Sequence, residues 1–355
     1  RKLAKLGDEE VRQAYQHSMA APAKILVVSR NGNRSAFSRG RLERFLQASG
    51  LKIAEAEQVT AKVFDQLLIH GAETISTSHL GLLTYLCLRQ EIGQKAGRRF
   101  LYWSEFQRSE RPLALLIGGA VGTGKSSIAT EVAHRLEIVR TQSTDMLREV
   151  MRTMIPQHLL PVLHVSSFEA WETLPIADKA GRDHDSLVAE GFRSQAQLLE
   201  VPSKAVLQRA EREHVSMILE GVHVSHSLQQ PEYATEAIRV HVTIAVLQSS
   251  TLRSRLKGRG SRVPKRHARR YLERFDSIWS LQSFLLSEAD RKDTAIVTND
   301  DLEKAVRQVI MTINRELSKH FEGTPHSAFG PAADGLDPNA DDPDWLSRVP
   351  ELING

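Results

Sequence analysis

Residues Gly119 to Ser126 read G-A-V-G-T-G-K-S, which matches the pattern G-x-x-x-x-G-K-[ST] in full. Glycines at these places let the backbone curl so tightly that successive N–H groups point at one anion. A following helix would present its positive N-terminal end to the same charge. The spacing is therefore typical of a loop that cradles the phosphates of a nucleoside triphosphate. We expect the nucleotide to be bound by Gly119, Gly122, Thr123, Gly124, Lys125, Ser126 and Ser127.

The residues on either side of this loop have the pattern that it requires. Before it, Leu113 to Ile117 form an apolar run that predicts a buried strand, and after it residues 128–136 place apolar side chains at helical spacing. In such a loop Lys125 reaches the β and γ phosphates, and the Ser126 hydroxyl is a ligand of Mg²⁺. The alternative is a glycine-rich turn that binds nothing, which this context disfavours.

A second group of polar residues follows the next predicted strand. Asp145 comes directly after Ser143-Thr144, and Arg148 and Arg152 lie four residues apart on one helical face. The carboxylate could orient or deprotonate an acceptor hydroxyl, and two arginines could bind an anionic group. The alternative is that Asp145 only caps the helix and both arginines are solvated.

An apolar strand candidate, Met217 to Leu219, ends in Glu220, Gly221 and then His223. A carboxylate at the end of a strand beside the phosphate-binding loop can hold Mg²⁺ or polarise the acceptor, so Glu220 is a candidate for both roles. His223 is a candidate for lining the substrate pocket, although a lone histidine is more often structural.

The richest run of positive charge extends from Arg253 to Arg274. Gly258, Gly260 and Pro264 interrupt it, which predicts a hinged lid rather than one helix. Guanidinium groups that close over the transferring phosphate would stabilise its charge, and Arg259 and Arg262 are the candidates for this role. Nucleic-acid binding is the rival interpretation, but no aromatic residue is interleaved with these charges before Tyr271.

The remaining pattern predicts a parallel sheet with helices on both faces, because strands and helices alternate after the loop. The five predicted strands are 113–117, 138–141, 215–219, 239–247 and 295–298, and a last helix covers 301–317. The mixed-charge stretch from Asp178 to Asp185 predicts a solvated loop rather than a metal site. Residues 319–355 are rich in Pro, Gly, Asp and Asn, which predicts a flexible tail.

A separate small unit precedes the loop. A strand at 24–30, a turn at Asn31-Gly32 and helices at 40–48, 54–69 and 76–88 are predicted there. The run VVSRNGNRSAFSRGRLERFLQASGL with these helices resembles the ATP-cone, a nucleotide-binding regulatory module. That resemblance implies an adenine nucleotide effector, ATP or dATP, and contacts from Arg30, Arg34, Phe37 and Arg39. Without the resemblance, the same residues form a solvated basic hairpin in which Phe37 anchors the core.

Composition sets milder bounds. A net charge of +4 and a pI near 9.2 are too modest to predict a nucleic-acid partner. The single cysteine, Cys87, excludes an intramolecular disulfide and favours a reducing compartment. No apolar run is long enough for a membrane span and no signal-peptide pattern opens the sequence, so we expect a cytoplasmic protein without a membrane partner. The sequence leaves open whether the chain forms a homo-oligomer.

The segments GGAVGTGKSS, STDMLREVMR, SSFEAW, GFRSQAQ and LEGVH together resemble the 2-phosphoglycerate kinase family. The resemblance implies an α/β P-loop kinase core with a five-stranded parallel sheet, after a small α+β ATP-cone domain. It implies ATP and Mg²⁺, and phosphoryl transfer to a small phosphorylated acceptor, with 2-phosphoglycerate giving 2,3-bisphosphoglycerate. It places Ser166, Ser167 and Gln195 in segments that line the acceptor pocket, although ordinary caps and loop hydrogen bonds explain them equally well. The implied divisions are 1–23, 24–106, 107–318 and 319–355.

Two other functions stay open at this point. One is a non-catalytic sensor of adenine nucleotides, which would need neither Asp145 nor Glu220 for chemistry. The other is a nucleoside triphosphatase that acts with nucleic acid, which would bind in a strongly salt-dependent way. A kinase that acts on another phosphorylated acceptor, such as an inositol phosphate, is a variant of the main hypothesis.

Overall fold

The computed structural model describes residues 25–230, 233–258 and 265–334, and these fall into two compact units. One unit runs from Ser109 to His320. The other combines the residues up to Arg108 with those from Phe321 onward, so the chain leaves this unit once and later returns to it. The predicted extension at 1–23 lies outside the described residues.

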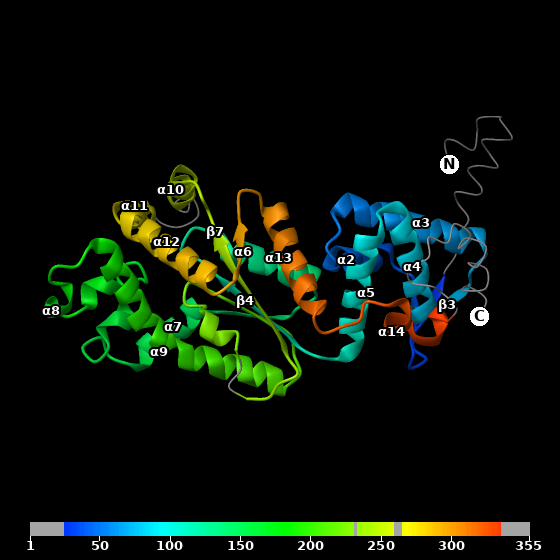
Figure 1. Ribbon diagram of the computed structural model, residues 1–355, viewed down its shortest axis with the longest axis horizontal. Coiled ribbons are helices and arrows are strands. Elements are labelled where there is room, and N and C mark those ends of the chain that lie inside the picture. Colours follow the sequence, from blue (N-terminus) through cyan, green and yellow to red (C-terminus); the bar gives the residue numbers. More distant parts are fainter. Residues whose placement is uncertain (1–24, 231–232, 259–264, 335–355) are drawn as a thin grey trace, which may run out of the picture. The chain divides into compact units, whose positions relative to one another are not determined.

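The unit from Ser109 to His320 is built on a five-stranded sheet in which every neighbouring pair is parallel. The order β5-β6-β4-β7-β8 places the strand before the phosphate-binding loop in the centre (Figure 1). This confirms the expected α/β fold with a five-stranded parallel sheet. The strands are β4 (Leu113–Gly118), β5 (Arg140–Ser143), β6 (Met217–Glu220), β7 (Ile238–Ala245) and β8 (Ala295–Thr298).

Burial explains which strands the sequence predicted well. All six residues of β4 are buried, because β6 and β7 flank it and helices cover both faces. β5 lies at an edge of the sheet and consists of polar residues. The predicted strand, 138–141, therefore began two residues too early, at the apolar Ile138 and Val139. The side chain of Val139 is in fact 89% exposed.

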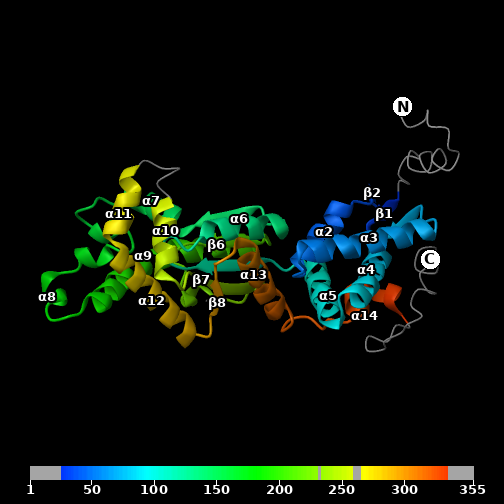
Figure 2. The same ribbon diagram turned by 90° about the horizontal axis from the view of Figure 1, so that it is seen from above.

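Helices surround this sheet (Figure 2). None of the helices in the described ranges is long and apolar enough to cross a membrane. The helices of eight or more residues in this unit are α6 (Lys125–Arg135), α7 (Thr144–Met154), α9 (His184–Arg212), α10 (Ser249–Gly258), α11 (Lys265–Glu273), α12 (Phe275–Arg291) and α13 (Leu302–Leu317).

The segment between α7 and α9 differs from its prediction. Residues 178–185 are not one solvated loop, because the short helix α8 (Ile176–Lys179) ends within it and α9 begins at His184. Asp183 caps α9 by accepting a hydrogen bond from the Ser186 N–H at 2.9 Å. In the described ranges, no group of three or more His, Cys, Asp or Glu side chains gathers as a metal site would require. Two 3-10 helices, η2 (Pro161–His164) and η3 (Ala170–Thr173), precede α8, and a third, η4 (His226–Leu228), follows β6.

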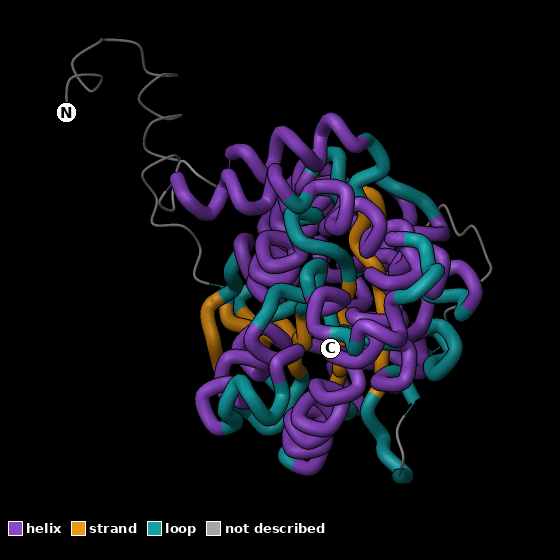
Figure 3. The backbone as a smooth tube through the Cα atoms, turned by 90° about the vertical axis from the view of Figure 1, so that its left-hand side faces the viewer, coloured by secondary structure: helices purple, strands orange, loops and turns teal. Residues whose placement is uncertain are grey.

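The other unit is mainly helical with a small mixed sheet in the order β2-β1-β3. Figure 3 distinguishes the helices of the chain (purple) from its strands (orange). The predicted strand and turn are found: β1 pairs antiparallel with β2 across a turn in which Gly32 has φ 80°. β3 pairs parallel with β1 and was not predicted. The elements are β1 (Leu26–Val28), β2 (Arg34–Ala36), β3 (Thr74–Ser76), α2 (Arg39–Ala48), α3 (Ile53–Ile69), α4 (Thr77–Glu91) and α5 (Gln94–Ser109).

The expectation of a flexible segment from residue 319 is wrong for residues 321–334. Helix α14 (Pro325–Phe329) and the 3-10 helix η6 (Gly330–Ala333) bury Phe329 in the core of this unit, with its ring centroid 6.2 Å from that of Phe100. The carboxylate of Glu105 accepts hydrogen bonds from the backbone N–H groups of residues 322 and 323. Apolar anchors in a Pro- and Gly-rich stretch were too widely spaced to show periodicity. Residues 335–355 lie outside the described part.

Candidate phosphotransfer site

The loop between β4 and α6 has the conformation that its glycines predict. Gly119, Gly122 and Gly124 have φ of 137°, 86° and 90°, a region that residues with a Cβ atom rarely adopt. A Cβ atom at Gly119 would lie 2.4 Å from the Ile244 carbonyl oxygen, and one at Gly124 would lie 2.3 Å from Nδ2 of Asn299. The tight curl that aims N–H groups at an anion therefore needs glycine for two reasons, backbone conformation and lack of space.

The cation of this loop is held close to the backbone. Nζ of Lys125 donates a hydrogen bond to the Ala120 carbonyl oxygen at 2.9 Å, and Oγ1 of the buried Thr123 donates to the same oxygen at 2.9 Å. Lys125 is the first residue of α6, so its charge adds to the positive end of that helix. The arrangement fits a polyphosphate. Ser127 lies exposed in the first turn of α6.

Glu220 is brought to the loop by the sheet. It pairs in register with Ile117 on one side and with Ser143 on the other, at the carboxyl ends of three adjacent parallel strands. Its side chain is 8% exposed, and Oε1 accepts a hydrogen bond from Oγ of Ser126 at 3.0 Å. A hydroxyl and a carboxylate at this distance are hard oxygen donors of the kind that Mg²⁺ prefers. Ser126 and Glu220 therefore fit the predicted metal site.

Asp145 lies in the first turn of α7, two residues after the end of β5, but its side chain does not cap the helix. Ser143 is the N-cap of α7, and its hydroxyl accepts a hydrogen bond from the Asp145 N–H at 3.1 Å. The carboxylate of Asp145 is left 66% exposed, 4.0 Å from Nε of Arg148. The side chain of Asp145 is therefore exposed and is not the cap of α7, and its contact with an acceptor stays a prediction.

The two arginines predicted beside it have different environments. Arg148 is 16% exposed, and its Nη1 donates hydrogen bonds to the carbonyl oxygens of Leu163 and Val165, each at 3.0 Å. Its Nε is buried without a hydrogen-bond partner. Arg152 is 41% exposed and forms an ion pair with Glu149 at 3.1 Å. Arg148 is therefore fixed and partly desolvated, whereas Arg152 lies on the helix surface.

Gln195 and His223 lie beneath the site. His223 is 2% exposed and Gln195 is fully buried, and His223 Nε2 lies 2.7 Å from Gln195 Oε1. Burial, and then the charges of Arg148 and Lys125, lower the pKa of His223 to about 3. Both side chains are enclosed by protein, so the direct acceptor contact that the sequence predicted does not fit this structure.

Ser166 and Ser167 follow η2 on the same side. Ser166 is half-buried, and its carbonyl oxygen accepts a hydrogen bond from the Glu169 N–H at 2.8 Å. The side chain of Ser167 is 8% exposed. The backbone of Ser166 thus forms a turn with Glu169, and a contact of either serine hydroxyl with the acceptor stays a prediction.

Arg259 and Arg262, the predicted lid arginines, lie outside the described residues. Helix α10 ends at Gly258 and α11 begins at Lys265, and the predicted hinge lies between these two ends, outside the described residues. Among the described lid residues, Arg270 and Arg274 contact the carboxylate of Glu169, which is 8% exposed, and Arg274 also pairs with Glu172 at 2.8 Å. These two arginines are thus engaged by acidic side chains of the same unit.

Asn299 and Arg255, which the sequence did not single out, connect the phosphate-binding loop to the segment after β8. The buried Asn299, just after β8, donates from Nδ2 to the Thr123 carbonyl oxygen at 2.7 Å. Arg255 of α10 donates to the Asn299 carbonyl oxygen at 2.6 Å. A polar residue at the end of a predicted parallel strand was the available signal for Asn299.

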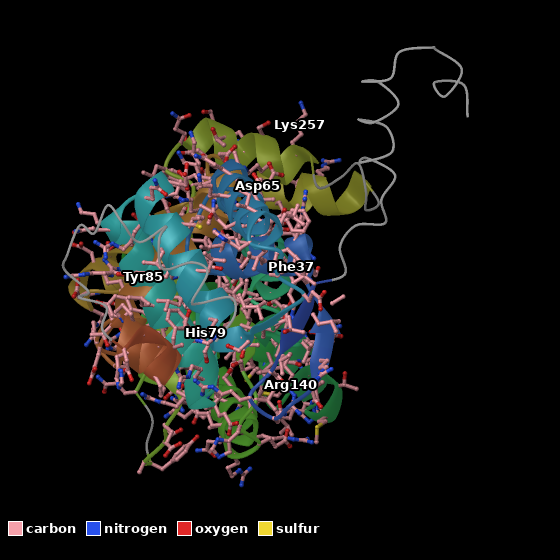
Figure 4. All side chains as sticks on the ribbon, turned by 90° about the vertical axis from the view of Figure 1, so that its right-hand side faces the viewer. Phe37, Asp65, His79, Tyr85, Arg140 and Lys257 are labelled. Carbon is pink, nitrogen blue, oxygen red and sulfur yellow. The ribbon has the colours of Figure 1, made fainter. Side chains whose placement is uncertain are left out.

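The smaller unit is the one that contains the residues up to Arg108 and those from Phe321 onward. In it Phe37, which Figure 4 labels, is half-buried. Its ring stacks on that of Phe64 with the centroids 5.8 Å apart. The guanidinium of Arg39 lies 3.9 Å from the centroid of the Phe64 ring and forms a cation–π contact with it. Arg30 and Arg34 are exposed. Burial, and then the charge of Arg30, lower the pKa of Arg108. The unit therefore has Phe37 as a core anchor within a set of exposed arginines.

Comparison with known proteins supports the sequence resemblance. The 2-phosphoglycerate kinase of Pyrococcus furiosus is 33% identical over 290 residues, which cover 81% of this chain and 93% of that protein. The 2-phosphoglycerate kinase of Thermococcus kodakarensis is 34% identical over 295 residues, with 83% and 98% covered. That of Methanopyrus kandleri is 33% identical over 288 residues, with 80% and 85% covered.

No family model matches the chain. Among solved structures, a gluconokinase from Sinorhizobium meliloti 1021 has a TM-score of 0.31 and 16% identity, and covers 59% of this chain and 95% of that one. The assignment therefore rests on the sequence relatives, whose identity extends over most of both chains. The chain belongs to the 2-phosphoglycerate kinase family and is a phosphotransferase.

Proposed function

We propose that the protein transfers the γ-phosphoryl group of ATP to 2-phosphoglycerate and forms 2,3-bisphosphoglycerate. The observation that carries the proposal is the meeting of three strand ends, where Lys125 and the Ser126–Glu220 pair lie on the nucleotide side and Asp145 on the acceptor side. The relatives named 2-phosphoglycerate kinase support the choice of acceptor.

In this proposal each residue has one task. The P-loop backbone and Lys125 bind the phosphates, and Ser126 with Glu220 holds Mg²⁺, which neutralises charge on the phosphate oxygens. Asp145 accepts the proton of the acceptor hydroxyl. This role needs a carboxylate that a substrate can reach, and the carboxylate of Asp145 is exposed. Arg148 binds an anionic group of the acceptor, since a phosphorylated hydroxy acid carries both a phosphate and a carboxylate.

The smaller unit would bind an adenine nucleotide as an effector. The support is the set of exposed arginines around the Phe37–Phe64 stack, together with the pKa of Arg108, which burial and then the charge of Arg30 lower. A bound anion would offset the repulsion of Arg108 by Arg30. ATP or dATP supplies that anion. Arg34 and Arg39 complete the proposed contacts.

The test is an acceptor screen with purified protein and Mg-ATP, followed by ³¹P NMR of the product. The acceptors are 2-phosphoglycerate, 3-phosphoglycerate, glycerate and inositol phosphates, and Lys125→Ala is the control for contaminating kinases. We expect 2-phosphoglycerate to be turned over fastest, at least tenfold above the others. Faster turnover of an inositol phosphate, or ADP release that no acceptor stimulates, would refute the proposed acceptor.

A further inference from the structure

We infer that Thr144, His223 and Gln195 form one buried hydrogen-bond chain with a fixed direction, and that this chain positions the acceptor side of the site against Glu220. The inference rests on the proposed phosphotransfer and assigns to these three residues a positioning role. None of them needs to touch a substrate.

The direction of the chain follows from its last residue. Nε2 of Gln195 donates to the carbonyl oxygens of Val162 and Val165, the second at 3.2 Å. Carbonyl oxygens only accept, so the amide nitrogen must point at them and Oε1 must face His223. Oε1 in turn accepts from His223 Nε2 at 2.7 Å, so Nε2 carries the proton.

The protonation of the other ring nitrogen of His223, Nδ1, follows from that of Nε2. A buried histidine with its pKa lowered to about 3 is neutral, so Nδ1 carries no proton when Nε2 has one. Oγ1 of Thr144 lies 3.3 Å from Nδ1 and must be the donor. The charged groups that act on this ring are Arg148 and Lys125, and both favour the neutral form.

The chain joins elements that are far apart in sequence and carry the proposed site. Thr144 is the residue before Asp145, at the start of α7. A Cβ atom at Gly221 would lie 1.8 Å from Oγ1 of Thr144, so the backbone just after Glu220 contacts this hydroxyl directly. The chain thereby sets the position of Asp145 relative to Glu220.

At its far end the chain fixes the loop that also holds Arg148. The Val165 carbonyl oxygen accepts hydrogen bonds from both Gln195 and Arg148. All three members of the chain are buried, and the ring of His223 stacks on Phe192 with centroids 5.8 Å apart. A fully satisfied polar chain inside a core holds one arrangement, because any rotation leaves a buried group unpaired.

The experiment uses variants of the full-length protein with side chains of similar size. Thr144→Val removes the donor hydroxyl, whereas Thr144→Ser keeps it, and Gln195→Glu keeps the acceptor for His223 but loses the donor to the loop. Gln197→Glu makes the same change at an exposed position of α9 and is the control. We expect Thr144→Val and Gln195→Glu to lower kcat for acceptor phosphorylation by on the order of 10²-fold, with KM for ATP unchanged. Thr144→Ser and Gln197→Glu should stay close to the natural protein.

A second readout does not depend on activity. In ¹⁵N NMR at neutral pH, His223 should be neutral with its proton on Nε2, and Gln195→Glu should change its nitrogen shifts. A charged His223, a proton on Nδ1, or an equal effect of the variants on KM for ATP and on acceptor turnover would overturn the inference. If the natural protein phosphorylates none of the acceptors, the proposed function fails, and the NMR result still decides the direction of the chain.

Discussion

The hydroxyl of Ser126 donates a hydrogen bond to Oε1 of Glu220 at 3.0 Å, although 94 residues separate the two in sequence. One belongs to the first turn of α6 and the other ends β6, and the sheet order places β6 directly beside β4. The pair unites the helix that follows the P-loop with the carboxylate of the adjacent strand. Its arrangement leads to the first prediction.

Replacing Glu220 by glutamine should raise the Mg²⁺ concentration needed for half-maximal activity by roughly 10- to 100-fold. The amide keeps the size of the side chain and can still accept from Ser126, but it lacks the negative charge that attracts the cation. Activity measured against Mg²⁺ at fixed ATP checks this. Glu190→Gln, at a position of α9 where the side chain is 44% exposed, is the control. Equal Mg²⁺ curves for Glu220→Gln and the natural protein would remove Glu220 from the metal site.

Replacing Asn299 by aspartate should weaken ATP binding, with KM for ATP raised by about tenfold. The Nδ2 donor to the Thr123 carbonyl oxygen becomes an acceptor, so two oxygens face each other across 2.7 Å and the loop at Gly124 must shift. Asn299→Ala removes the bond without the repulsion and should have a smaller effect. Steady-state kinetics for both variants decide the matter, and a larger effect of alanine would contradict this explanation.

Stability should fall as the pH is lowered from about 7 to 5. His223 and His241 are buried, and burial lowers their pKa from 6.5 to about 3 and about 4. The unfolded chain therefore binds more protons than the folded one in this window, which makes the free energy of unfolding rise with pH by up to about 1.4 kcal/mol per pH unit for each histidine.

Urea unfolding at several pH values measures this slope. In a His241→Gln variant, the contribution of the two histidines to this slope should fall by about half, because one of the two titrating groups is removed. A slope near zero between pH 5 and 7 would show that folding does not lower the pKa of these histidines, because the folded and unfolded chains would then bind equal numbers of protons.

Phe329→Ala should destabilise the smaller unit by about 3 kcal/mol, since Phe329 is 5% exposed and packs on Phe100 and Gly81. Hydrogen exchange of α4 and α5 should become faster, while β4 and β7 of the other unit should keep their protection. Leu302→Ala, at a position that is 44% exposed, is the control. Unchanged exchange in α4 would mean that residues 321–334 are dispensable for that unit.

Much of the unit from Ser109 to His320 could be predicted from the sequence, because the patterns that indicate its elements are local. The P-loop motif, the apolar run of β4 and the helical stripe of α6 are contiguous, and the glycines are required by their own φ values. Glu220 could be selected because an acidic residue ended an apolar strand. The edge strand β5 was displaced because an edge strand needs no continuous apolar run.

The tertiary structure decided which polar residues lie at the surface of the site and which lie beneath it. Sequence spacing could not distinguish the exposed carboxylate of Asp145 from the enclosed His223 and Gln195, because burial depends on elements far apart in the chain. It gave no sign that Asn299 reaches the Thr123 carbonyl oxygen, 176 residues away. The return of residues 321–334 to the smaller unit could not be predicted either, since a few buried side chains anchor this segment without any repeating pattern.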